Sequence, residues 1–135
     1  LRAARVIVER EAGGIRVVGK PPFRPVDVTT EVFPGIHVFL TPGHTWGQQA
    51  TMFNDAKGRT VVFVPDVMPT AAHLGAAYSL SYDVEPYTSM ISRRWFLEEA
   101  ATNNWLLVLD HEPGNPLQRV TRNDRGWYMF TPESL

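Results

Sequence analysis

Three apolar segments of the sequence are each followed closely by a side chain that can bind a metal ion. His44 comes after the segment 36–40, Asp66 after 60–64 and His111 after 105–109. If these segments are strands of a layered α/β protein, their carboxyl ends lie along a common edge, where the three side chains can meet. Two imidazoles and one carboxylate are an ordinary ligand set for Zn²⁺ or a related divalent cation. The spacing therefore predicts a metal site at the edge of a sheet.

Each of the three residues also has a simpler interpretation. His44 lies in the turn "TPGHTWG", where it could be a hydrogen-bonded surface residue. Asp66 could cap a following element, and His111, between two acidic residues, could belong to a solvated charge cluster. Their shared position at strand ends favours the metal site. Under that hypothesis, the glycines of the turn let the backbone bend sharply and approach the metal closely.

The two other histidines are less informative. His37 alternates with core residues inside an expected strand, which we interpret as the polar face of that strand. His73 either caps a short helix or leans toward the site, within a segment, 67–86, that has no sustained period.

The elements that must position these residues follow from local patterns. Pro86 is typical of the first turn of a helix, which we expect to run to about residue 102 and to end at Asn103 and Asn104. Four residues of this helix share one face at helical spacing: Tyr87, Met90, Ile91 and Trp95. The next segment, "WLLVLD", is an uninterrupted apolar run, which is typical of a strand buried on both faces.

Other segments indicate hairpins and single strands. The segments 48–53 and 60–65 flank a loop rich in turn-forming residues, as do 117–122 and 127–131, so each pair predicts a β-hairpin. The proline-rich segment 21–35 predicts a crossing loop and an edge strand, and 15–20 a short strand. Residues 1–12 fit a helix ended by two glycines, or a strand through 5–8. Together the pattern predicts one domain, 1–135, of the α/β or α+β class with hairpins.

The composition excludes several classes of function. The chain has 135 residues, a formal net charge of -1 and no cysteine. Without cysteine, disulfides, zinc-thiolate sites and thiol catalysis are excluded, which leaves histidine and carboxylates as metal ligands. Because no basic stripe and no apolar run of about 18 residues occurs, neither nucleic acid nor a membrane is expected as a partner. A small molecule or a protein is the expected partner, and the compartment stays open.

Three sequence blocks resemble the metallo-β-lactamase fold superfamily. "TPGHTWGQQ" is similar to its "TPGHTxGxx" motif, "VVFVPDVMPTAAHL" to the strand that ends in a bridging aspartate, and "LLVLDHEP" to the block with its last histidine. The runs "PDVMPTAAHL" and "YDVEP" particularly resemble the branch of acyl-homoserine lactonases and methyl-parathion-hydrolase-like enzymes. The resemblance implies an αββα sandwich, of which this chain would be the C-terminal half.

The resemblance also implies roles for individual residues. His44 would be the third histidine of a first metal site, His111 the histidine of a second, and Asp66 the catalytic carboxylate that bridges both metals. The cofactors would be two divalent ions, zinc first, with manganese, cobalt or iron as the other candidates. A metal-activated hydroxide would then hydrolyse an ester-like bond in a lactone, an ester or a phosphotriester. His73, Tyr78 and Tyr82 would lie on the substrate side as hydrogen-bond donors.

One motif of that superfamily is missing from this sequence. Members carry an "HxHxDH" motif in the N-terminal half, and it occurs nowhere in these 135 residues. Each metal would therefore receive only two protein ligands from this chain, so we expect weak metal binding and no meaningful hydrolysis by the chain alone. An N-terminal half chain or a second copy would cover the exposed sheet. The alternative is an inactive half-fold that serves as a binding or oligomerising module.

Overall fold

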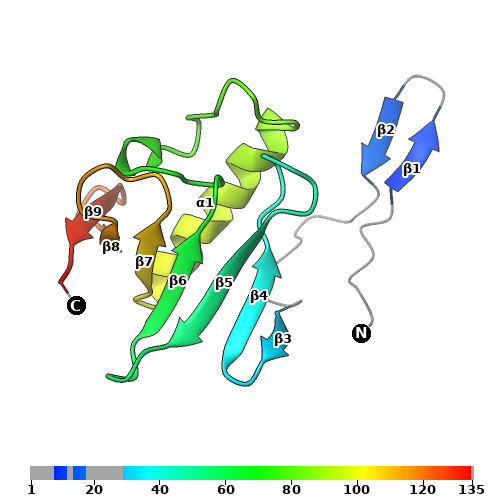
Figure 1. The fold of residues 1–135 in the computed structure, drawn as a ribbon. Helices are drawn as coiled ribbons and strands as arrows, with labels where there is room; N and C mark the ends of the chain where they lie inside the picture. Colours follow the sequence, from blue (N-terminus) through cyan, green and yellow to red (C-terminus); the bar gives the residue numbers. More distant parts are fainter. Residues whose placement is uncertain (1–7, 12–13, 18–28, 135) are drawn as a thin grey trace.

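The computed structural model describes residues 8–11, 14–17 and 29–134 of the chain, and its main feature is a seven-stranded sheet (Figure 1). Its strands lie in chain order: β3 (Thr30–Phe33), β4 (Ile36–Leu40), β5 (Gln49–Asn54), β6 (Thr60–Val64), β7 (Leu106–Leu109), β8 (Leu117–Arg122) and β9 (Tyr128–Pro132). A separate two-stranded sheet consists of β1 (Val8–Glu11) and β2 (Gly14–Val17). The expected α/β class with hairpins is therefore confirmed.

One pair of neighbours in the seven-stranded sheet is parallel. β6 and β7 run in the same direction, with Val61 opposite Leu106 and Val64 opposite Leu109, whereas the other neighbouring pairs are antiparallel. A parallel pair needs a long crossover connection, and helix α1 (Pro86–Thr102) provides it. The carboxyl ends of β6 and β7 consequently lie side by side.

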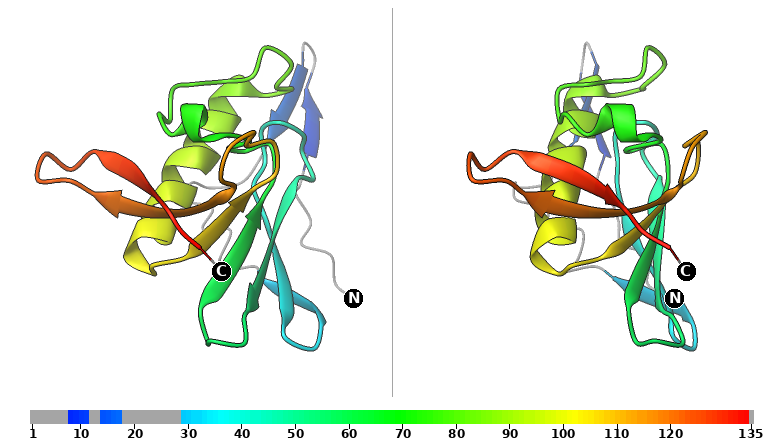
Figure 2. Two further views of the ribbon diagram at one scale, coloured as in Figure 1. Left: turned by 60° about the vertical axis from the view of Figure 1, so that its left-hand side comes forward. Right: turned by 90° about the vertical axis from the view of Figure 1, so that its left-hand side faces the viewer.

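Helix α1 covers one face of the sheet, and β8 and β9 bend toward it (Figure 2). The core lies between them, where the strand residues Phe39, Val62 and Leu107 meet Phe96 and Leu97 of the helix. The predicted helix bounds are confirmed, with Pro86 in the first turn and Asn103 as the C-cap. β7 is buried on both faces as predicted, since Leu106 and Leu107 point to opposite sides and are both fully buried.

The predicted apolar face of the helix meets the core only in part. Trp95 packs against the core and Met90 is half-buried, but Tyr87 and Ile91 are 70% and 50% exposed. The buried positions are Ser89, Ser92, Arg93, Phe96, Leu97 and Ala100. Helical spacing shows which residues share a face, but not which face meets the sheet. In α1 the buried face begins with small polar residues, because the turn that carries His44 packs there.

The predicted orientation of His37 is also wrong. It shares the face of β4 that also carries the buried Phe39, so it points toward α1 instead of forming a polar outer face. The hairpins β5–β6 and β8–β9 and the edge strand β3 confirm the corresponding predictions. β2 confirms the short strand for 15–17, and the predicted crossing loop lies at 21–28, outside the described residues. Of the segment 1–12, the structure describes Val8–Glu11 as a strand, and the rest lies outside the described residues.

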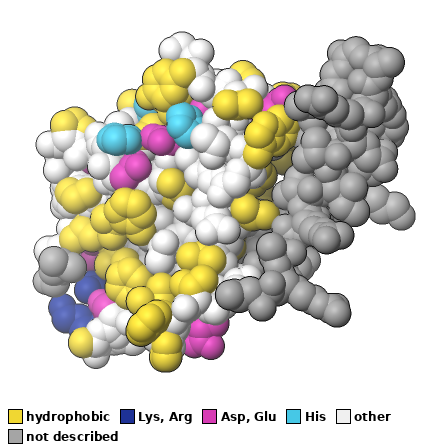
Figure 3. Space-filling view, turned by 45° about the vertical axis from the view of Figure 1, so that its right-hand side comes forward, with side chains coloured by type: hydrophobic (Ala, Val, Ile, Leu, Met, Phe, Trp, Pro, Cys, Tyr) yellow, Lys and Arg dark blue, Asp and Glu magenta, His cyan; other side chains and the backbone are white. Residues whose placement is uncertain are grey.

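The sheet face opposite α1 is apolar and partly open to solvent (Figure 3). Ile36, Phe53, Val61 and Leu106 form one row across four strands, and Val38, Thr51, Phe63 and Val108 form the next. Phe53 and Phe63 are 39% and 44% exposed. Histidine and carboxylate side chains lie at the upper border of this apolar surface (Figure 3). In the part of the chain that the structure describes, no helix combines the length and apolarity needed to cross a bilayer.

Candidate metal centre

The three residues predicted from their spacing meet at Asp66. Its Oδ2 lies 3.3 Å from Nε2 of His44, and its Oδ1 lies 3.3 Å from Nε2 of His111. The carboxylate thus presents one oxygen to each imidazole. The side chains of His44 and Asp66 are 17% and 24% exposed, whereas that of His111 is 62% exposed. Imidazole nitrogens and carboxylate oxygens are atom types that bind divalent cations, so this grouping makes a metal site a candidate.

The turn that carries His44 is fixed against the start of α1. Backbone N–H groups of Glu85 and Val84 donate to the carbonyls of Gly43 and His44 at 2.9 and 3.2 Å. Gly43 has a φ of 133°, and a Cβ there would lie 2.2 Å from the backbone nitrogen of Ser89. The predicted sharp turn is therefore confirmed and the close approach seen here is to the helix backbone, whereas close approach of this glycine to a metal stays a prediction. A Cβ on Gly47 would meet nothing within 4 Å.

A buried carboxylate lies behind His44. Oδ1 of Asp83 is 3.0 Å from Nδ1 of His44, and the side chain of Asp83 is fully buried. An ionised carboxylate only accepts hydrogen bonds, so this bond requires the N–H on Nδ1, and a neutral ring that makes it carries its lone pair on Nε2, toward Asp66. The Nε2 lone pair and Oδ2 of Asp66 would then be two acceptors facing each other at 3.3 Å, which is unfavourable unless a positive charge lies between them. That charge is either a second ring proton, which makes His44 an imidazolium, or a metal ion. The donor set therefore fits a divalent cation.

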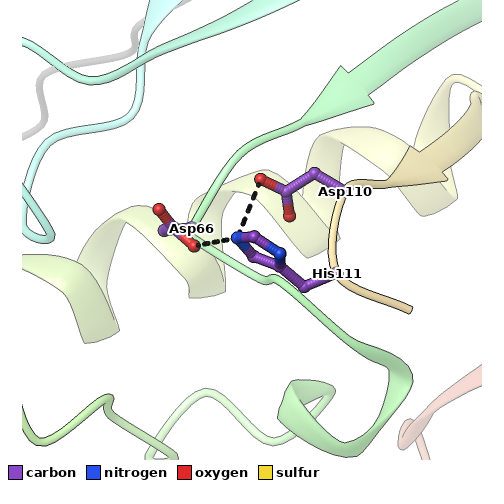
Figure 4. A group of neighbouring side chains, drawn as sticks. All are labelled: Asp66, Asp110 and His111. Atoms are coloured by element: carbon purple, nitrogen blue, oxygen red, sulfur yellow. Dashed lines mark ion pairs between the residues drawn. The ribbon is translucent and has the colours of Figure 1, made fainter. Parts of the chain in front are cut away.

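Asp110 adds a second carboxylate on the other side of Asp66. Asp66, Asp110 and His111 each offer a ligand atom, and these atoms lie within 4.8 Å of one another. Both carboxylates approach the same imidazole nitrogen, with Oδ2 of Asp110 at 3.6 Å (Figure 4). Burial raises the pKa of Asp110, the nearby charge of Asp66 raises it further, and His111 opposes both. Oδ1 of Asp110 is buried without a hydrogen-bond partner among the described residues. A cation here would reduce the repulsion between the two carboxylates.

The loops after β6 and β7 are tied to each other. The N–H of His111 donates to the carbonyl of Pro69 at 3.1 Å, and the N–H of Ala71 donates to Oε2 of Glu112 at 2.7 Å. Ala71 begins a short 3-10 helix, η2 (Ala71–His73), and His73 is its last residue, at the end of a short helix as one of the two alternatives predicted. These bonds hold the Asp66 loop and the His111 loop in one position relative to each other.

The three residues expected on the substrate side differ in their surroundings. Tyr82 is 66% exposed. Its ring and that of His44 are in edge-to-face contact, with the ring centroids 5.5 Å apart. His73 is half-buried, and its Nδ1 forms a 2.8 Å hydrogen bond with Oγ1 of Thr70. Tyr78 is 60% exposed and packs over Gly75. The structure thus brings Tyr82 beside the candidate site. The role of Tyr82, His73 and Tyr78 as hydrogen-bond donors stays a prediction.

Two residues of the site were missed in the sequence. Asp110 is not among the predicted ligands, although it directly follows the buried strand that also precedes His111. Asp83 lies within "YDVEP", but no local pattern indicates that a loop aspartate will be buried against a histidine 39 positions away. Only the pairing of 84–85 with 43–44 brings it there.

A hollow of about 490 Å³ lies at the opposite end of the sheet. Gly35, Thr60 and Asn103 mark its position at the start of β4, the start of β6 and the end of α1, and none of the candidate ligands lines it. This hollow therefore lies away from the residues with metal-binding chemistry. The convergence of imidazoles and carboxylates is the stronger indication of a site.

No family model matches the sequence, and a comparison with the curated proteins finds no significant relative. The solved structures do contain similar folds. AidC, described as a dizinc quorum-quenching lactonase in complex with a product, shares 22% sequence identity with this chain at a TM-score of 0.67. The matched region covers 78% of this chain and 36% of AidC. The hydrolase AbOPH of the β-lactamase superfamily is 21% identical with a TM-score of 0.68, over 78% of this chain and 36% of AbOPH.

A third similar structure is an N-acyl homoserine lactone hydrolase, with its product N-hexanoyl-L-homoserine at the catalytic metal centre. It is 20% identical with a TM-score of 0.54, over 63% of this chain and 34% of that protein. This chain therefore spans about a third of the length of each of these structures. The predicted resemblance is confirmed at the level of fold: the chain has the fold of the C-terminal half of a metallo-β-lactamase domain.

Proposed function

We propose that this chain is the C-terminal half of a dinuclear metal-dependent hydrolase of ester-like bonds. One observation carries the proposal: the side chains at three strand ends, predicted as His44, Asp66 and His111, meet with one oxygen of Asp66 facing each imidazole. The fold similarity to hydrolases supports the same conclusion.

The residues of this chain would hold two divalent cations, with zinc as the first candidate because AidC is described as a dizinc enzyme. His44 and Asp66 would serve one ion, and Asp66, His111 and Asp110 the other. When bound, such ions lower the pKa of water and stabilise negative charge on a substrate oxygen. The remaining ligands would come from an N-terminal half that carries the "HxHxDH" motif.

The substrate that we propose is a small molecule with a lactone, ester or phosphotriester bond. Two of the similar structures are described with a homoserine product of lactone hydrolysis, so lactones come first. Tyr82, exposed beside His44, and half-buried His73 are proposed to donate hydrogen bonds to the substrate as negative charge develops on its oxygen. Tyr78 is the third candidate.

The apolar sheet face would be covered by the N-terminal half or by a second copy of the chain. Phe53 and Phe63 lie on this face and are substantially exposed, which is uncommon for neighbouring aromatic residues on a monomer. The site residues lie at the border of the same face (Figure 3). A cover on this face could therefore add ligands to both metals.

The same exposed face supports a second candidate function. A half-fold that has no complement would bind or oligomerise through the apolar rows around Phe53 and Phe63 without catalysis. The two functions differ in one respect that can be measured, because the module would assemble without metal.

The first experiment is native mass spectrometry with metal quantification on the chain purified alone and together with its complementary segment. The hydrolase hypothesis predicts about two divalent ions and lactone hydrolysis for the pair, and weak binding without hydrolysis for the chain alone. A pair that forms without metal and hydrolyses none of the three substrate types would contradict it and would support the module. Uptake of two zinc ions at micromolar affinity by the chain alone would show that the shells close without a partner.

A further inference from the structure

Asp83 is the one fully buried carboxylate side chain among the ion pairs of the described residues, and it lies outside the set of candidate metal ligands. Its Oδ1 accepts from Nδ1 of His44 at 3.0 Å, and its Oδ2 accepts from the backbone N–H of Leu80 at 3.2 Å. Both oxygens therefore have a donor. Burial of a carboxylate is costly unless such donors are fixed in place, so the arrangement indicates a specific role.

The negative charge of Asp83 has a nearby positive counterpart. Arg93, on the buried face of α1, is fully buried, and its charge and that of Asp83 interact. The guanidinium does not form an ion pair with Asp83. Its Nε donates to the carbonyl of Val67 at 2.6 Å and its Nη1 to that of Ala76 at 3.4 Å. Arg93 thus fixes the loop between Asp66 and Asp83 and keeps a positive charge close to the buried carboxylate.

The hydrogen bond to Asp83 has a chemical consequence for His44. A neutral imidazole has one N–H, and carboxylate oxygens face both ring nitrogens. The 3.0 Å hydrogen bond to the fully buried Asp83 is the shorter contact, which favours the N–H on Nδ1 and the lone pair on Nε2. Nε2 is the atom that faces Oδ2 of Asp66 at 3.3 Å. The same hydrogen bond fixes the rotation of the ring, and the turn around Gly43 fixes its backbone.

We infer that Asp83 is a positioning residue that sets the tautomer and orientation of His44, so that Nε2 is available to a cation between His44 and Asp66. The inference rests on the proposed function for the identity of the cation, but not for the tautomer. A carboxylate behind a histidine ligand typically changes metal affinity by about 10- to 100-fold. Asp83 would act through His44 and would not touch the substrate.

The test compares Asp83→Ala and Asp83→Asn with the unsubstituted protein by two measurements. The first is the tautomer of His44 in metal-free protein, from ¹⁵N chemical shifts of the ring at a pH where the ring is neutral. We expect the Nδ1–H form in the unsubstituted protein and a shift toward the Nε2–H form in Asp83→Ala. The second is zinc affinity by competition with a chelator in the assembled protein, which we expect to fall by about 10- to 100-fold.

Asp83→Asn keeps the shape of the side chain and an acceptor oxygen, so it tests the role even if the alanine variant unfolds. It should retain more of the Nδ1–H form than the alanine variant while it weakens zinc binding. Asp124→Ala, in the exposed turn between β8 and β9, is the matched control for loss of a charge and should change neither measurement.

Two results separate this inference from the proposed function. An unchanged His44 tautomer in a folded Asp83→Ala protein would overturn the positioning role, whether or not the protein hydrolyses lactones. A shifted tautomer in a protein that binds no zinc would support the positioning role, and the hydrolase proposal alone would fail.

Discussion

Gly43 and Ser89 are in direct backbone contact, although one lies in the turn after β4 and the other in the first turns of α1. A Cβ on Gly43 would lie 2.2 Å from the nitrogen and 2.3 Å from the Cα of Ser89, and the φ of 133° is itself unfavourable for other residues. The position of His44 therefore depends on the absence of one side chain next to it.

Gly43→Ala should destabilise the protein by about 2 to 3 kcal/mol and weaken metal binding, because either the turn or the helix must move. Gly47→Ala is the matched control in the same motif, since its Cβ would meet nothing within 4 Å. It should change the free energy of unfolding by less than about 0.5 kcal/mol. Urea unfolding followed by circular dichroism measures both, and equal effects of the two substitutions would contradict this interpretation.

Asp66→Asn should abolish the bridge between the two proposed cations, because an amide oxygen carries no charge and the amide nitrogen is no ligand. In the assembled protein we expect loss of bound metal and a decrease in kcat/KM of more than about 100-fold. Zinc should raise the melting temperature of the unsubstituted protein but not that of the variant, since a ligand stabilises only a state that binds it. Asp124→Asn makes the same chemical change at an exposed turn and should behave like the unsubstituted protein. Full metal content in Asp66→Asn would exclude the bridging role.

His73 should make the metal-free fold sensitive to mild acid. Burial and the charge of Arg93 lower the pKa of His73 below the ordinary histidine value of 6.5, and the charge of Asp83 opposes them. Because the pKa is lower in the folded than in the unfolded state, the unfolded chain binds more protons between the two values. The contribution of His73 to stability is therefore complete above about pH 6.5 and is lost as the pH falls through the folded pKa.

Thermal unfolding of metal-free protein at several pH values between 5 and 7.5 measures this effect. His73→Gln keeps a hydrogen-bonding side chain near Thr70 but does not titrate, so its melting temperature should fall less on acidification than that of the unsubstituted protein. Parallel pH profiles for the two proteins would mean that His73 contributes nothing to the acid response.

Phe63→Asn should weaken association through the apolar sheet face without changing the fold. Phe63 is 44% exposed on that face, so its removal costs little in the monomer but loses apolar contact with any cover. We expect the dissociation constant of a dimer or of the paired halves to rise about tenfold, as measured by sedimentation. Tyr87→Asn removes an exposed aromatic residue from α1 instead and should leave association unchanged. If both substitutions weaken association equally, the sheet face is not the interface.

The sequence allows prediction of the strands, the helix bounds and the three converging residues because each of these features leaves a local pattern. The run at 105–110 predicts burial on both faces of β7, and Pro86 marks the start of α1. His44, Asp66 and His111 can be related because each follows a strand. In all of these cases the information lies within a few neighbouring positions.

The features that were predicted wrongly or missed depend on contacts between distant segments. The buried face of α1 contains Ser89 and Arg93 instead of Tyr87 and Ile91, because the neighbours of the helix include a polar turn and a loop carbonyl as well as the apolar sheet. Asp83 becomes a partner of His44 only through backbone pairing of their two segments. Neither contact leaves a trace in the local pattern of polarity.

The parallel pairing of β6 with β7 has a consequence for how this chain tolerates change. Val64 lies opposite Leu109, and Asp66 and His111 each follow two positions later, so their separation is set by the spacing between adjacent strands. Replacing core residues with others of similar size leaves the backbone pairing of β6 and β7 intact. Asp66 and His111 then keep their separation even when the core residues are substituted. Insertion or deletion of a single residue in either strand shifts the pairing by one position and turns one of the two side chains to the other face of the sheet. Natural variation in this part of the chain should therefore be rich in substitutions within β6 and β7 and free of length changes there.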